Sequence, residues 1–303
     1  MLANALPYLR CPHCGTDLTR TDDTVRCAGR HTFDVARQGY LSLLTGTPRA
    51  GTGDTAPMVS ARHDFLGAGH YSPVAEALAE SATRYAGHGC VLDLGAGTGY
   101  YLTAVLDALP GRVGVAMDVS RYALRRSARA HPLLAAIGAD TWQPLPVHTG
   151  AAGLVLTVFA PRNGTEIRRA LAADGALLLV TPTPRHLTEL VPALGLVRVD
   201  AEKQERLDRA LGADLTHVTT TRHEYPLRLD HHDVVTVVGM GPSARHLTPD
   251  ALNERIAALP DPLTVTVSVD LSVYRPQPRG GHPEQQISTS MANLERHPRQ
   301  FPS

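Results

Sequence analysis

The sequence lacks the long apolar run and the leader-like start that would point to a membrane or secreted protein. No apolar stretch approaches the ~18 residues that a membrane-spanning helix needs, and the longest, such as 151–160, have the length of a strand. Pro7, Arg10 and Cys11 come too early for the basic, apolar and small-residue succession of a signal peptide. We therefore expect a cytoplasmic protein with no membrane partner.

An excess of charge of either sign is also missing. The 29 lysines and arginines balance 29 acids, which excludes a generally basic coat for nucleic acid. Lysine itself is nearly absent, because Lys203 is the only one. Arginine suits phosphates and base edges through its planar fork of donors, so RNA binding stays open. Hydrophobic residues make up 43% of the 303 residues, enough for a folded core, and the length predicts about two domains.

Cysteine is scarce, and three of the 4 cysteines fall close together near the N-terminus. Cys11, Cys14, Cys27 and His31 form the pattern C-x2-C-x12-C-x3-H, whose three thiolates and one imidazole complete the tetrahedral shell of a structural zinc. Reduced core cysteines with a surface histidine are the alternative. His13 is a competing ligand, but its place inside the first turn points it elsewhere.

Four segments are expected along the chain. Short strands at 17–20, 24–26 and 31–35 make residues 1–45 a zinc ribbon, which has too little core to be stable without its metal. Residues 46–73 form a linker, rich in Gly, Thr and Pro at 45–57, with a helix at 58–66 and a turn at 67–73. A larger domain spans 74–275, and 276–303 is predicted to be a disordered tail.

A buried strand at 90–94 runs directly into a glycine-rich turn and then a helix. The turn reads Asp93-x-Gly95-x-Gly97-x-Gly99, with Thr98 inside it. Its glycines let the backbone approach a ligand at the N-terminus of the helix. A dinucleotide fingerprint needs a glycine where Tyr100 stands. The spacing instead resembles the first motif of class I S-adenosylmethionine-dependent methyltransferases.

Strands and helices alternate beyond this turn. The next strand ends at Asp118, whose carboxylate can accept the hydroxyl protons of a ribose. The third leads to Asp140, where methyltransferases commonly place an acid or amide near the adenine. The fourth runs into Phe159, Pro161 and Arg162, at the mouth where a substrate base would sit. The alternation predicts an α/β, Rossmann-like domain with a mostly parallel sheet and these elements: strands 113–117, 133–137, 152–159, 176–181, 219–229 and 263–274; helices 74–85, 100–109, 120–131 and 165–171.

Each of these residues has a plainer alternative. Asp118 could cap a strand end, Asp140 could be a turn residue, and Asp93 could orient the glycine loop without touching a ligand. Cys90 is expected in the core, apart from the zinc set. The arginines that repeat at helical intervals favour a solvated face over an RNA-facing stripe: Arg121, Arg125, Arg126 and Arg129. Residues 197–222 are poorly periodic and could form an insertion lining an RNA cleft.

The zinc pattern followed by a methyltransferase motif resembles the 23S ribosomal RNA (guanine-N1)-methyltransferases, including the tylosin-resistance branch found in macrolide producers. The resemblance runs from Cys11 to about Tyr274. It rests on these strings: the C-P-x-C at 11–14, Phe33-Asp34 with Gly39-Tyr40, Gly53-Asp54-Thr55-Ala56, Met58 with Ala61-Arg62, Phe65-Leu66 through Gly69-His70-Tyr71, Val91-Leu92-Asp93 through Gly99-Tyr100-Tyr101, Ala160-Pro161, and Thr181-Pro182 with Pro184-Arg185-His186-Leu187.

The resemblance implies transfer of a methyl group from S-adenosylmethionine to N1 of a specific guanine in a 23S rRNA hairpin that lines the peptide exit tunnel, with macrolide resistance as the outcome. It implies structural zinc on the four N-terminal ligands. The implied contacts to S-adenosylmethionine are Tyr71, Gly97, Thr98, Asp118 and His186. A homodimer is a further expectation. Arg162 departs from the pattern, since relatives often carry cysteine there.

Two rival functions remain open from the sequence. The first is a small-molecule methyltransferase of antibiotic biosynthesis with a purely structural ribbon. The second is a non-enzymatic, zinc-dependent RNA-binding protein with a vestigial core. Methyl transfer to RNA would exclude both, and binding of S-adenosylmethionine would exclude the second.

Overall fold

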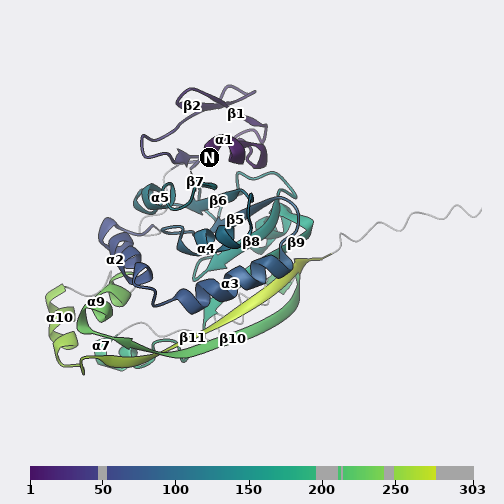
Figure 1. Ribbon diagram of the computed structural model, residues 1–303. Coiled ribbons are helices and arrows are strands. Elements are labelled where there is room, and N and C mark those ends of the chain that lie inside the picture. Colours follow the sequence, from purple (N-terminus) through teal and green to yellow (C-terminus); the bar gives the residue numbers. More distant parts are fainter. Residues whose placement is uncertain (47–52, 196–210, 213, 242–248, 278–303) are drawn as a thin grey trace, which may run out of the picture.

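An eight-stranded sheet organises the computed structural model, which describes residues 1–46, 53–195, 211–212, 214–241 and 249–277 (Figure 1). The strand order is β10-β11-β9-β8-β5-β6-β7-β4. The strands from β9 to β4 run parallel, whereas β11 lies antiparallel between β9 and β10. Their bounds are β4 Leu41–Ser42, β5 Cys90–Leu94, β6 Gly114–Asp118, β7 Leu134–Gly138, β8 Ala152–Val158, β9 Leu171–Pro182, β10 Leu215–Leu229 and β11 Leu263–Pro276. The predicted class I methyltransferase fold is confirmed.

Apolar residues alternate between the two faces of the sheet, so each face has its own core. Val91 of β5 packs with the helices on one face, and Leu92 packs on the other with α6 and the N-terminal segment. Period-two alternation in strands buried on both sides produces this division. The helices are α1 Leu2–Ala5, α2 Ala56–Gly67, α3 Ser72–Tyr85, α4 Tyr100–Ala108, α5 Arg121–Ser127, α6 Gly164–Ala170, α7 Leu190–Leu194, α9 His231–Gly239 and α10 Pro249–Ala257, with a 3-10 turn η1 at Leu6–Tyr8.

The N-terminal ribbon is a separate three-stranded antiparallel sheet, in the order β1-β2-β3. Its strands are β1 Leu18–Thr21, β2 Thr24–Cys27 and β3 Thr32–Asp34, each within a residue or two of the predicted range. Figure 1 shows the ribbon above the part of the sheet that contains β6 and β7. The chain then enters the main sheet as β4, in which Leu41 and Ser42 pair in parallel with Ile137 and Gly138 of β7. The ribbon is therefore anchored to the larger domain by a strand as well as by packing.

Some element boundaries differ from the predicted ones. The helix after Ser120 ends at Ser127 instead of His131, because residues 128–130 turn away. Ser120 does cap it, since its side chain accepts a hydrogen bond from the Ala123 N–H. The expected insertion at 197–222 is wrong where the structure describes its end, because β10 already begins at Leu215. Residues 197–210 and 213 of that range, and 278–303 of the predicted tail, lie outside the described residues, and Pro276 belongs to β11.

No helix among the described residues has both the length and the apolar character that crossing a membrane requires.

Candidate functional site

The glycine loop between β5 and α4 adopts a backbone that only glycine accommodates freely. Gly95 has φ +75°, and a Cβ there would lie 2.6 Å from the Cβ of Ala160. Gly97 has φ +57°, with the Arg62 side chain directly above it. The N–H groups of Gly95 and Ala96 bond to the Met117 carbonyl, so the loop is tied to the end of β6. The loop thereby presents the N-terminus of α4 at the carboxyl edge of the sheet, where open α/β sheets bind their ligands.

Asp93 and Asp118 lie at the ends of the two neighbouring strands β5 and β6. Asp93 is 2% exposed, and burial together with the nearby Asp118 raises the pKa of its carboxyl to about 8. Burial also raises the pKa of Asp118, while hydrogen bonds from the N–H groups of Ser120 and Gly97 oppose the rise. Two carboxyls in one dry site favour a cationic or hydroxyl-bearing ligand over an anionic one.

Asp140 follows β7 at the same edge of the sheet. Its Oδ1 accepts a hydrogen bond from the N–H of Trp142 at 3.0 Å, and its carbonyl accepts one from Gln143. The residue therefore shapes a turn, as its alternative interpretation expected. Contact with an adenine stays a prediction.

Tyr71, His186 and Phe159 form an aromatic cluster at the mouth of the loop. The His186 ring lies 5.7 Å from the Phe159 ring at an interplanar angle of 27°, and Tyr71 lies against both. The N–H of Ser268 donates to His186 Nδ1 at 3.3 Å, and His186 Nε2 lies 3.1 Å from the Tyr71 hydroxyl. Burial lowers the pKa of His186 to about 4, so the ring is neutral at pH 7. Because Nδ1 accepts a hydrogen bond from Ser268, the ring proton sits on Nε2. Nε2 then donates to Tyr71, whose own hydroxyl proton is free for another acceptor.

The three residues predicted to face a substrate base do not share one environment. Phe159 is 38% exposed and has φ 54°, a left-handed backbone that is unusual for a phenylalanine. Pro161 is exposed, whereas Arg162 is only 7% exposed, so its side chain lies inside the protein. Residues with a strained backbone concentrate at ligand sites. Of the three residues, Phe159 is therefore the best candidate to contact the substrate base.

Two further residues line the narrow pocket against the loop, together with Asp93, Gly97 and Phe159. Arg62 of α2 bonds to Asp54 at 2.8 Å and to the Met240 carbonyl, 178 positions away in sequence. The Tyr101 hydroxyl is buried and has no hydrogen-bond partner within the described part of the chain. Both residues fall inside strings that carry the family resemblance, but their position at the pocket depends on long-range packing.

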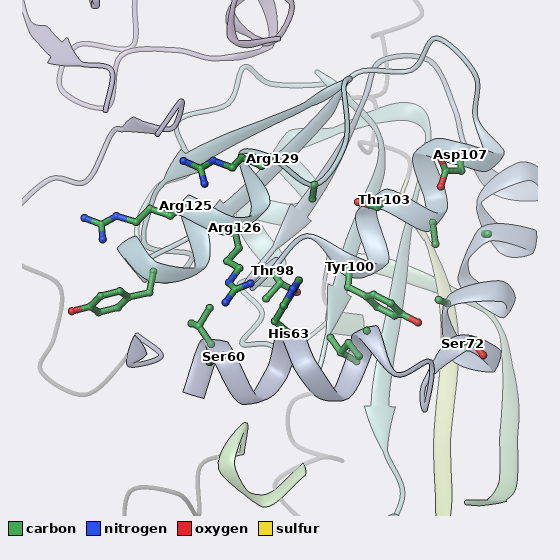
Figure 2. Close-up of a pocket in the computed structure, with 18 of the residues that line it drawn as sticks. Ser60, His63, Ser72, Thr98, Tyr100, Thr103, Asp107, Arg125, Arg126 and Arg129 are labelled. Atoms are coloured by element: carbon green, nitrogen blue, oxygen red, sulfur yellow. The ribbon is translucent and has the colours of Figure 1, made fainter. Parts of the chain in front are cut away.

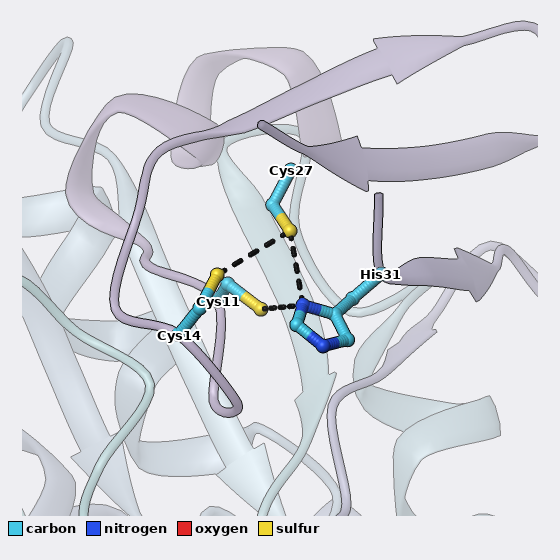
Figure 3. A group of neighbouring side chains, drawn as sticks. All are labelled: Cys11, Cys14, Cys27 and His31. Carbon is cyan, nitrogen blue, oxygen red and sulfur yellow. Dashed lines mark hydrogen bonds between the residues drawn. The ribbon is translucent and has the colours of Figure 1, made fainter. Parts of the chain in front are cut away.

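The four predicted zinc ligands come together in the ribbon (Figure 3). Cys14 Sγ lies 3.5 Å from Cys27 Sγ, and His31 Nδ1 lies 3.3 Å from Cys27 Sγ and 3.6 Å from Cys11 Sγ. All four ligand atoms lie within 4.8 Å of one another. Zn–S bonds of ~2.3 Å place tetrahedral sulfur ligands about 3.8 Å apart, so the set fits one zinc ion.

The surroundings of this cluster support metal binding. The hydroxyl and N–H of Thr16 lower the pKa of Cys14 to about 6, which favours the thiolate that a metal requires. His13 stacks on Phe33 at 5.9 Å and stays outside the ligand set. Cys90 is fully buried in β5, as expected.

Comparisons with known proteins agree with this geometry. The family model described as "RlmA, N-terminal", a zinc ribbon, matches residues 9–46. The 23S rRNA (guanine(748)-N(1))-methyltransferase of Streptomyces fradiae is 49% identical over 281 residues, covering 92% of this chain and 100% of that protein. A Micromonospora griseorubida protein assigned as a 23S rRNA (guanine-N(1)-)-methyltransferase is also 49% identical, over 91% of this chain and 100% of its own length.

A Bacillus subtilis protein with the same assignment is 28% identical and covers 87% of this chain. The similarity to the first two relatives extends over the ribbon, the glycine loop and the sheet together. The chain belongs to the 23S rRNA (guanine-N1)-methyltransferase family.

Proposed function

We propose that the protein transfers a methyl group from S-adenosylmethionine to N1 of a guanine in the 23S rRNA hairpin that lines the peptide exit tunnel, and thereby confers resistance to tylosin-type macrolides. The observation that carries this proposal is the 49% identity with two relatives over their full length. The name of the Streptomyces fradiae relative specifies guanine 748, which is the first position to examine.

The cofactor is proposed to lie along the carboxyl edge of the sheet. Asp118 would accept hydrogen bonds from the ribose, and the backbone of Gly97, Thr98 and Gly99 would face the methionine part. Asp93 would balance the positive charge of that part, and Tyr71 would donate its free hydroxyl proton. The enclosed pocket here measures only about 30 Å³, so side chains at its wall must move when the cofactor enters.

S-adenosylmethionine supplies a methyl group that is already activated by the sulfonium charge. The protein therefore has to align the target nitrogen with that methyl and keep water out. N1 lies on the Watson–Crick edge, so the guanine must be unpaired or flipped before it enters. We propose that the exposed Phe159 ring stacks on the guanine, with Pro161 beside it.

The proton on N1 has no dedicated acceptor in this proposal. Asp118 accepts hydrogen bonds from two backbone N–H groups, and Asp140 accepts one within its own turn. Asp93 is buried at the narrow pocket against the loop and is assigned to the cofactor. We therefore propose that water takes the proton after transfer, so that catalysis comes mainly from alignment.

The test is transfer of radiolabelled methyl from S-adenosylmethionine to protein-free 23S rRNA, followed by mapping of reverse-transcription stops. N1-methylguanine cannot pair, so the proposal predicts one strong stop at a guanine of the tunnel hairpin. Cells with and without the gene should differ at the same position. Label that enters only small metabolites would contradict the proposal and favour the antibiotic-tailoring alternative.

A further inference from the structure

A second and much larger cavity, of about 1000 Å³, lies on the helical face of the domain (Figure 2). Helices α2 and α3 form one side of this groove, and α4 with α5 and the turn after it form the other. Leu66, Thr98 and Tyr100 line both this groove and the narrow pocket at the glycine loop. The groove is therefore continuous with the narrow pocket at the glycine loop, and it extends from there along α4 to Asp107 and past α5 to Arg129.

One wall of the groove is cationic. Arg125, Arg126 and Arg129 line it and are exposed, because α5 turns Ala123, Leu124 and Ser127 into the core. No ion pair within the described ranges engages any of the three guanidinium groups. In Figure 2, Arg126 extends toward Thr98 and His63, while Arg125 and Arg129 point away along the wall. Three neighbouring cations that no described acid neutralises favour an anionic ligand.

Two acids also line the groove, Asp107 of α4 and Glu76 of α3. Asp107 Oδ1 lies 3.3 Å from His131 Nε2, so its described ion pair is with that histidine and not with a groove arginine. The rest of the lining is mostly apolar, with the rings of Tyr100 and Tyr122 among alanines and Val59. The Arg121 and Arg125 guanidinium carbons lie 4.8 and 5.8 Å from the centre of the Tyr122 ring, which fixes that ring in place.

A polynucleotide fits this combination of surfaces. Arginine forks bind phosphates in a bidentate manner, and aromatic rings stack on bases of any sequence. We propose that this groove binds the sugar-phosphate backbone of the substrate RNA beside the target guanine, with Arg125 and Arg129 on successive phosphates. This inference rests on the proposed function, which supplies the RNA. The shared residues Thr98 and Tyr100 would let the strand pass from the groove to the site of methyl transfer.

The test compares two double variants that each remove two positive charges. R125Q/R129Q removes the two outer groove arginines and keeps Arg126 beside the glycine loop. R84Q/R228Q removes two exposed arginines on α3 and β10, outside the groove, and serves as the matched control. Affinity for protein-free 23S rRNA transcript is measured from 50 to 300 mM KCl, together with methyl transfer to it and the affinity for S-adenosylmethionine.

We expect R125Q/R129Q to reduce the slope of log Kd against log salt by about 2, because each phosphate that an arginine neutralises adds about 1 to that slope. Its RNA affinity at low salt should fall at least ~10-fold, with unchanged affinity for S-adenosylmethionine. The control variant should match the wild type. An unchanged salt slope in R125Q/R129Q, with a wild type that methylates RNA, would overturn the inference alone. A wild type that transfers no methyl to RNA would refute the proposed function and the inference with it.

A protein occupant is the other outcome. If R125Q/R129Q changes the molar mass measured by light scattering and leaves the RNA salt slope unchanged, the groove binds a second copy of the chain. That result would also overturn the inference.

Discussion

The Oδ2 atom of Asp118 accepts a hydrogen bond from the backbone N–H of Gly97 at 2.9 Å, while its Oδ1 accepts one from the N–H of Ser120 at 2.8 Å. The carboxylate at the end of β6 therefore holds the glycine loop as well as the start of the next helix. A ribose bound at Asp118 would use the remaining lone pairs of the same two oxygens.

Replacing this carboxylate should weaken cofactor binding. We expect Asp118→Ala to cost ~1–3 kcal/mol in affinity for S-adenosylmethionine, because the variant offers the ribose hydroxyls no acceptor and leaves the loop without an anchor. Calorimetric titration measures the effect. Asp250→Asn is the control, because Asp250 is an exposed residue of α10 that lines neither the narrow pocket nor the groove. Wild-type affinity in Asp118→Ala would remove the residue from the site.

Cofactor binding should release a proton from Asp93. The pKa of its carboxyl is raised to about 8, so at pH 7 the free protein holds that proton, and a cationic ligand favours the ionised form. Titration at pH 7 in buffers of different ionisation enthalpy should show release of most of one proton. Asp93→Asn should abolish the release. Binding without proton exchange in the wild type would contradict the assignment.

The same group makes stability depend on pH. Its pKa in the folded protein exceeds the ordinary 3.8, so its stabilising contribution is complete below about pH 4 and is lost as the pH rises through about 8. Between these values the folded state binds more protons than the unfolded state. The stability difference between Asp93→Asn and the wild type should therefore shift in favour of the variant as the pH rises, as measured by urea unfolding at pH 5 and pH 9.

The unpartnered hydroxyl of Tyr101 should serve the cofactor. Tyr101→Phe removes a buried polar atom that has no partner within the described part of the chain, so the thermal midpoint should stay unchanged or rise. Affinity for S-adenosylmethionine should nevertheless fall about 3- to 10-fold if the hydroxyl bonds to the ligand. A variant that binds the cofactor as tightly as the wild type would leave this hydroxyl without a role there.

Phe159 should contribute to RNA methylation through its proposed stacking on the guanine. The absence of base stacking in Phe159→Ala is expected to cost ~1–3 kcal/mol in kcat/KM for rRNA. Phe159→Tyr keeps the stacking surface and should retain most activity. Equal activity of all three proteins would show that the ring does not face the guanine.

The ribbon should depend on zinc. Cys11→Ser is expected to lower the metal content from one ion per chain to none and to expose residues 1–45 to protease, because a module of this size has little core of its own. His13→Ala and Cys90→Ala should retain one zinc ion, since neither residue belongs to the ligand set. A metal-free wild type with a protected ribbon would refute the zinc assignment.

Much of the fold could be predicted because its signals are local. The glycine spacing after Asp93, the alternation of strands with helices, and the cysteine spacing each depend on neighbours within about 20 residues. The structure confirms the parallel sheet and the clustering of the four zinc ligands.

Long-range contacts explain what the sequence could not reveal. Two residues, Leu41 and Ser42, are too few to show strand periodicity, so their pairing with β7 had no local signal. The contact of Arg62 with Met240 joins helices that are far apart in the chain. The groove arginines are exposed, as predicted, but the position of α2 opposite α5, which makes their face one wall of a groove, is visible only in three dimensions.

The short strand β4 has a mechanical consequence for the whole enzyme. It pairs in parallel with β7, the strand that leads to Asp140. The chain that leaves the zinc cluster is therefore hydrogen-bonded to the edge of the sheet where the adenosyl group is proposed to bind. A displacement of the zinc ribbon, such as one caused by its binding to an rRNA hairpin, would be transmitted through the pairing of β4 with β7 to the cofactor site.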